Sequence, residues 1–136
     1  MPSLTELASY LESIAPAQTA ESWDNVGVLV RCAQEVTGVL CALDITPATV
    51  REARAVGCNA IVSHHPVIFR PLKELRQDDV PALLVREGVS AVCMHTNLDK
   101  AQGGVNDVLA QALGLRDTEP FAGGIGRVGV LPETME

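Results

Sequence analysis

Between residues 36 and 131, four short apolar runs alternate with three segments that carry helix-start and helix-stop signals. Strands that are each separated by one helix favour right-handed crossovers and a parallel sheet. The runs are continuous in Val, Ile, Leu and Cys, which is typical of strands buried on both faces. The order therefore predicts an α/β fold with three layers, in which a largely parallel (mixed) sheet carries helices on both faces. The expected strands are residues 36–43, 60–63, 89–94 and 128–131, and the expected helices are residues 46–56, 79–88 and 105–113.

The first 30 residues predict one further helix and one further strand. Ser3 and Glu6 have the spacing of a capping box, and apolar residues recur at helical spacing from Leu4, so a helix should begin there. Residues 26–30 are a strand candidate. No repeat, low-complexity segment or linker divides the sequence, so we expect residues 1–136 to form a single α/β domain.

The composition argues against several classes of protein. Hydrophobic residues make up 47% of the chain but aromatic residues only 3%, which disfavours disorder and predicts an aliphatic core. The net charge of −7 disfavours nonspecific nucleic-acid binding, where Lys and Arg must neutralise phosphates. No apolar run approaches the ~20 residues of a membrane span, and the N-terminus lacks the features of a signal peptide. Since the four cysteines form no CxxC pair, we expect reduced thiols and a cytoplasmic protein.

All three histidines of the chain lie directly after expected strands. His64 and His65 follow one strand, and His95 follows the next, with Asp99 close behind. The strand before them ends at Asp44. Ligands of open α/β sheets bind beyond the carboxyl ends of the strands. Imidazoles and carboxylates gathered at this edge suit a metal site better than a core.

The number of ions at such a site is left open by the sequence. Adjacent histidines in extended backbone project to opposite sides, so His64 and His65 would each serve one of two neighbouring ions. They would bind the same ion only if the loop turns sharply. Asp99 can bridge two ions, and two cations about 3.5–4 Å apart would promote a hydrolytic displacement. Nitrogen and oxygen donors suit Zn, Mn, Fe or Co.

Other polar and aromatic residues near these loops have alternative interpretations. Asp44 can be a turn or cap residue instead of part of the site. Asn97 and its neighbour Thr96 are expected to shape the loop. Trp23, the only tryptophan, can serve packing or stack on a substrate. The pair of glycines at 103–104 only weakly resembles a phosphate-binding loop, because two glycines before a helix are common.

Five short motifs occur in the order seen in a known family. They are WDNVG at 23–27, DITP at 44–47, SHHPVIF at 63–69, HTNLD at 95–99 and GGVND at 103–107. In these motifs the chain resembles the NGG-one-interacting-factor-three-like proteins, many of which carry the name GTP cyclohydrolase type-two homologue. The resemblance extends from the first helix to residue 129.

The resemblance implies a cytoplasmic α/β protein with two divalent metal ions, assembled as a ring-shaped homo-hexamer. It implies that His64, His65 and Asp99 are metal ligands, and that His95 lies beside them, supporting the ligands or lining a substrate pocket. Asp44, Asn97 and Trp23 are further candidates for that surrounding group. Family members are longer, and their C-terminal half supplies another His and Glu to the metals. This chain has no histidine after His95, so we expect it to correspond to the N-terminal half, with an incomplete site.

Three functions compete on these grounds. The first is a metal-dependent hydrolase, with a small nucleotide as its substrate. The second is a metal-binding protein without catalysis, such as a metal chaperone or an interaction scaffold. The third is a folded unit that binds no metal tightly. Saturable metal binding separates the third from the others, and turnover of a nucleotide separates the first from the second.

Overall fold

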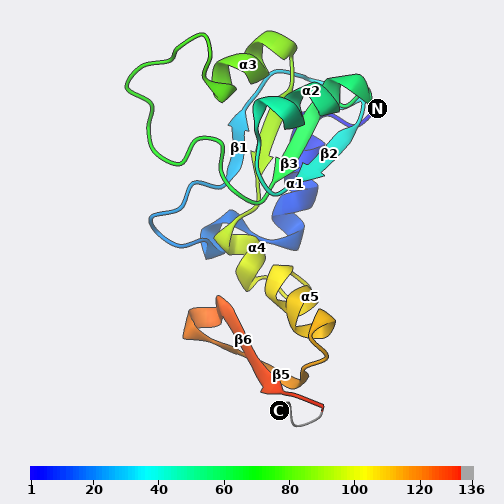
Figure 1. The fold of residues 1–136 in the computed structure, drawn as a ribbon, viewed down its shortest axis with the longest axis vertical. Helices are drawn as coiled ribbons and strands as arrows, with labels where there is room; N and C mark the ends of the chain where they lie inside the picture. Colours follow the sequence, from blue (N-terminus) through cyan, green and yellow to red (C-terminus); the bar gives the residue numbers. More distant parts are fainter. Residues whose placement is uncertain (133–136) are drawn as a thin grey trace.

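A four-stranded sheet with order β1-β4-β3-β2 forms the centre of the protein, in a computed structural model that describes residues 1–132 (Figure 1). Strands β2, β3 and β4 are parallel, and β1 runs antiparallel to β4. The expected α/β fold with a largely parallel, mixed sheet is therefore confirmed. The strands are β1 Gly27–Val30, β2 Val39–Ala42, β3 Ala60–Ser63 and β4 Ser90–Cys93.

Local capping signals set the boundaries of the helices beside this sheet. A capping box joins Ser3 and Glu6 at the start of α1, as expected. Thr46 caps α2 and a proline occupies its first turn, which suits the fixed φ of proline. Gly88 ends the third helix in the left-handed conformation, with φ 67°. These helices are α1 Leu4–Ile14, α2 Pro47–Ala55 and α3 Val80–Glu87.

Two aliphatic cores lie on opposite faces of the sheet. Leu4 from α1 packs with Val92 of β4 in one core. Val50 from α2 and Leu84 from α3 pack with Ile61 of β3 in the other. Neighbouring residues of a strand point to opposite faces, so each central strand contributes to both cores. The arrangement is the expected three-layer one, with helices on both faces.

The C-terminal part of the chain extends away from the sheet (Figure 1). Strand β6 lies close to the expected 128–131 segment but pairs antiparallel with β5, so the parallel order ends at β4. Arg127 of β6 is largely buried and donates hydrogen bonds to the carbonyls of Lys100 and Ala101 and to Asp107, which ties the hairpin to the helices above it. The elements are α4 Thr96–Lys100, α5 Val105–Ala112, β5 Arg116–Phe121 and β6 Gly126–Val130, with 3-10 turns at Ala17–Thr19 and Ala122–Gly124.

Two of these elements, α4 and β5, were not expected from the sequence. Helix α4 is only five residues long, too short to show a helical period. All six residues of β5 are exposed, and Asp117 and Pro120 are poor strand formers. No helix within residues 1–132 is both long enough and apolar enough to span a bilayer.

Candidate metal centre

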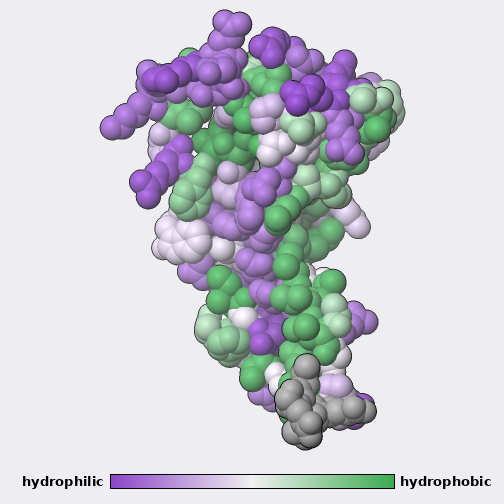
Figure 2. Space-filling view, in the orientation of Figure 1, coloured by the Kyte–Doolittle hydropathy of each residue, from purple (hydrophilic) through white to green (hydrophobic). Residues whose placement is uncertain are grey.

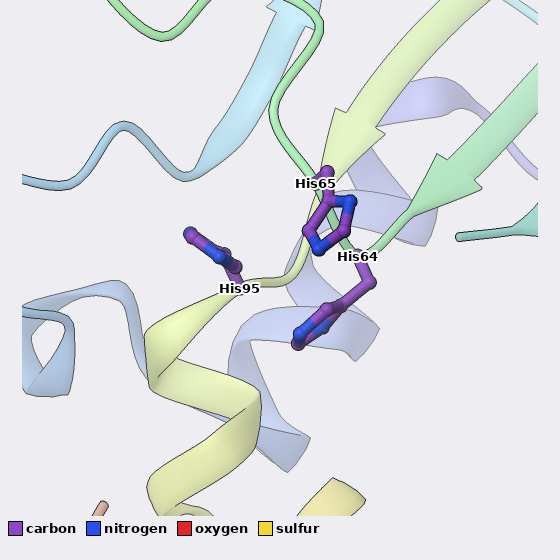
Figure 3. A group of neighbouring side chains, drawn as sticks. All are labelled: His64, His65 and His95. Carbon is purple, nitrogen blue, oxygen red and sulfur yellow. The ribbon is translucent and has the colours of Figure 1, made fainter. Parts of the chain in front are cut away.

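Three imidazole rings converge at the carboxyl edge of the sheet (Figure 3). Strands β3 and β4 are parallel and paired in register, with Ser63 opposite Cys93, so the residues that follow them meet at the same edge. The ring centroids of His64, His65 and His95 lie between 5.0 and 5.7 Å apart. One ligand atom from each ring lies within 4.8 Å of the others, which is the spacing of a group that could hold a metal ion.

Each ring is held through its Nδ1 atom. His64 Nδ1 lies 3.0 Å from the carbonyl oxygen of Met94, His65 Nδ1 lies 2.8 Å from Asp44 Oδ1, and His95 Nδ1 lies 2.9 Å from Asp24 Oδ1. A carbonyl or ionised carboxylate only accepts hydrogen bonds, so Nδ1 is the protonated nitrogen. Nε2 of each ring then keeps its lone pair. Metal-ligating histidines are oriented in this way, and the residues present fit a bound cation.

The adjacent histidines face the same centre because the chain bends after β3. Residues 64 and 65 form a bend, and the two rings are tilted by 45° to each other. Ser63 Oγ donates to the His65 carbonyl at 2.8 Å, which stabilises this bend. Of the two arrangements that the sequence left open, the structure has the sharp turn.

Helix α4 brings Asp99 beside the imidazoles. His95 is the N-cap of α4, and the Asp99 amide donates to the His95 carbonyl at 3.0 Å, one helical turn away. Asp99 Oδ1 lies 3.6 Å from His64 Nε2, beyond hydrogen-bond distance. A carboxylate oxygen and a free imidazole nitrogen therefore border the same space, as two ligands of one ion would.

The other predicted residues surround this group. Asn97 is buried; its side chain accepts from the His95 amide at 2.9 Å and donates to the Ala15 carbonyl at 2.8 Å, so it fixes the loop as expected. Asp44 is exposed and holds His65. The Trp23 ring lies edge-on to His95, with centroids 6.4 Å apart.

Asp24 is a site residue that the sequence reasoning missed. Its side chain is 0% exposed and accepts four hydrogen bonds, from His95 Nδ1, Thr96 N, Thr96 Oγ1 and Asn25 N. Burial opposes ionisation of this carboxyl, but the hydrogen bonds from Thr96 and His95 outweigh burial and lower the pKa of Asp24. Asp24 lies in the 23–27 motif, but no strand ends there to draw attention to it.

Cys93 lies beneath the histidines without being a ligand. Burial, together with the charge of Asp24, raises the pKa of its thiol to about 12. The protonated thiol donates to the His64 carbonyl at 3.2 Å. All four cysteines, each within residues 1–132, are free thiols. The donors that face the centre are therefore nitrogen and oxygen.

Comparison with known proteins identifies the chain's relatives. The model of the Duf34/NIF3 (NGG1p interacting factor 3) family matches residues 2–136. The chain belongs to the Duf34/NIF3 family. The resemblance seen in the five motifs is thus confirmed. A Duf34/NIF3 relative from Staphylococcus aureus strain MRSA252, named GTP cyclohydrolase 1 type 2 homolog, is 43% identical over 118 residues.

Solved structures show the same fold. The crystal structure of a Bacillus cereus protein related to NIF3 matches with a TM-score of 0.80 and 40% identity, over 88% of this chain and 34% of that one. Reduced HcgD from Methanocaldococcus jannaschii matches with a TM-score of 0.84 and 27% identity, over 94% of this chain and 54% of that one. The alignment with the S. aureus relative covers 84% of this chain but 32% of the relative, so the chain spans about a third of its length.

Proposed function

We propose that this Duf34/NIF3 protein binds a divalent transition-metal ion with His64, His65, His95 and Asp99. The observation that carries the proposal is the shared orientation of the rings, in which each Nδ1 is engaged by an oxygen and each Nε2 is free. Three imidazoles and one carboxylate suit Zn, Fe, Mn or Co. Including His95 as a ligand goes beyond the set implied by the family resemblance, which holds His64, His65 and Asp99.

For the longer relatives, we propose that a second divalent ion binds beside the first. A bound divalent ion acts as a Lewis acid and lowers the pKa of water, which is the chemistry of metal-dependent hydrolysis. The name of the S. aureus relative favours a nucleotide as the substrate class. We therefore propose hydrolysis as the function of the complete site, and a non-catalytic metal-binding or scaffold role as the alternative.

The four free thiols suit a reducing compartment, and we propose the cytoplasm as the location of the protein.

Metal content of purified variants tests the site. We expect the wild-type chain to retain a transition metal after loading and desalting, and His64→Ala, His65→Ala and His95→Ala each to lose most of it. Tyr10→Ala is the matched control, because it removes an exposed ring from α1, outside the histidine cluster. Equal metal content in all five proteins, with unchanged circular dichroism, would show that the imidazoles do not bind the ion.

Nucleotide turnover separates the catalytic proposal from its alternative. The metal-loaded chain and a version extended to the length of the relatives should be assayed with GTP and other nucleoside triphosphates. Turnover that disappears in His64→Ala supports the hydrolase. Saturable metal binding without turnover in the extended protein supports the binding or scaffold role.

A further inference from the structure

Two of the chain's four aromatic side chains lie together at the border of the histidine cluster. The rings of Trp23 and Phe69 have centroids 6.1 Å apart, and Trp23 also lies 6.4 Å from the His95 ring. Both remain exposed, at 57% and 43%. Large apolar rings left in water next to a group of polar ligands are typical of a binding surface.

The exposure of these rings does not come from loose loops. Asn25 Nδ2 donates to the Ile68 carbonyl at 2.5 Å, which joins the loop that carries Trp23 to the loop that carries Phe69. Asp24, the residue after Trp23, is anchored to Thr96 and His95. The backbone beside each ring is thus fixed by hydrogen bonds, while the rings themselves face solvent.

We propose that Trp23 and Phe69 form a wall that binds a planar heteroaromatic ring, such as a nucleobase, on ligands whose polar group reaches the histidine cluster. The two rings are inclined at 62°, so they cannot enclose a third ring in a parallel sandwich. The ligand ring stacks on the indole, and Phe69 borders its edge. The proposal rests on the proposed function, because the cluster with its metal supplies the second contact.

The position of the wall favours a small ligand over a protein partner. Trp23 is in edge contact with His95, one of the three imidazoles, so a compound seated on the indole lies within reach of the cluster. Stacking on an aromatic side chain accepts any base, because every base has a π-face. The wall therefore selects a class of ring rather than one nucleotide.

Trp23 is the only tryptophan, so its fluorescence reports directly on the wall. The probes are guanosine, adenosine and cytidine monophosphates, and ribose 5-phosphate is the control without a ring. Each is titrated into the zinc-loaded chain and into the chain in EDTA, with free N-acetyltryptophanamide correcting for absorbance. We expect saturable quenching by at least one nucleotide and none by ribose 5-phosphate.

Phe69→Leu should weaken this nucleotide binding about fivefold, in the range of edge-to-face aromatic contacts. Phe121→Leu is the matched control, because Phe121 is 54% exposed but lies on the C-terminal hairpin. Metal content of both variants should equal that of the wild type. Calorimetry with Trp23→Leu, which should abolish ring binding, provides a second measurement that does not need the fluorophore.

The outcomes distinguish the wall from the metal site. If Phe69→Leu weakens the quenching, the result supports the wall. If the chain also holds no metal, the wall is still supported, but the proposed metal-binding function is rejected. If the chain binds metal but none of the three nucleotides quenches saturably, the proposed wall is rejected and the metal site is not. Equal weakening by Phe69→Leu and Phe121→Leu, or equal quenching by ribose 5-phosphate, overturns it as well.

Discussion

Asp24 fixes the orientation of His95 within the histidine cluster. Its two oxygens receive four hydrogen bonds and it has no donor to offer, so each partner presents a proton to it. An amide at this position would turn a nitrogen toward either Thr96 or His95. If that nitrogen faces Thr96, it opposes the backbone N–H of Thr96. If it faces His95, it donates to Nδ1 and stabilises the tautomer that carries its proton on Nε2. In either case the site is disturbed without loss of side-chain volume.

Asp24→Asn should therefore lower metal affinity by about 10–100-fold, the usual effect of removing a residue that orients a ligand. The measurement is competition against a chromophoric chelator. Asp44→Asn is the control, because Asp44 also holds a histidine but its side chain is 57% exposed and water can replace it. A smaller loss for Asp24→Asn than for Asp44→Asn would contradict this account of the site.

The lowered pKa of Asp24 also predicts how stability changes with pH. The carboxyl has a lower pKa in the folded chain than in the unfolded chain, where the pKa of an Asp is about 3.9. Ionised Asp24 thus stabilises the fold above that value, and the contribution is lost as pH falls through the lower, folded pKa. Urea unfolding of the metal-free protein between pH 3 and 6 should show a decline that is shallower in Asp24→Asn. Parallel curves for the two proteins would assign the acid sensitivity to other carboxyls.

At the scale of elements, the sequence predicted those helices and strands whose signals are local. The capping box at Ser3, the Thr46-Pro47 helix start and the Gly88 stop each act within one turn, so their pattern is visible in the sequence. The strand ends that bring His64 and His95 together follow from the parallel order alone.

What the sequence did not predict depends on long-range contacts. Strand β5 is stabilised by pairing with β6 and not by its own composition. The bond between Asp24 and His95 joins residues 71 positions apart, and nothing in either local pattern specifies that partner. The strand order predicted that His95 would lie near His64 and His65, as it does, and its role as a metal ligand stays a prediction.

The junction between α4 and α5 predicts the effect of a change at Gly104. A Cβ atom there would lie 2.0 Å from the Leu98 carbonyl oxygen and 2.9 Å from that of Ala101, both backbone atoms that cannot move aside cheaply. Gly104→Ala should lower the free energy of unfolding by about 1–3 kcal/mol, the range for overpacking. Because the strain falls next to Asp99, metal affinity should fall too.

Gly103→Ala is the control for this junction. Gly103 has φ 72°, but its Cβ would meet nothing within 4 Å. Gly103→Ala should therefore lower the free energy of unfolding by only about 1 kcal/mol, through backbone strain. Urea denaturation compares the two variants. A loss for Gly104→Ala no larger than that for Gly103→Ala would contradict the argument from close approach, because Gly104 has an ordinary φ of −78°.

At the scale of the whole molecule, apolar side chains remain uncovered on the C-terminal part. Figure 2 shows apolar surface over the region where α5 and the hairpin lie in Figure 1. A hollow of about 490 Å³ opens beside α5, with Leu98, Val105, Val108, Leu109 and Ala112 in its lining. Contiguous apolar surface of this kind drives association. We therefore propose that this surface is covered by self-association, with the hexameric ring implied by the family resemblance as the assembly.

Val108→Lys should shift the protein toward a monomer in light scattering, because a charge on this surface opposes burial. Val108 is 58% exposed on α5, and Val85, 60% exposed on α3, provides the control position for Val85→Lys. We expect the wild type and Val85→Lys to remain oligomeric at the same concentration. A monomeric wild type, or equal dissociation of both variants, would remove this surface from consideration as the interface.

The bond between Asp24 and His95 has a consequence for the order of events when the protein folds. The three histidines fall within residues 64–95, yet the carboxylate that orients the last of them comes from the loop before β1. Closing a loop of that length costs conformational entropy, and the pairing of β1 with β4 brings its two ends together. A chain in which β1 has not paired with β4 therefore carries all three imidazoles but lacks the element that holds Asp24 beside His95. At the metal site proposed above, the orientation of the imidazoles would therefore be complete only once the sheet has formed.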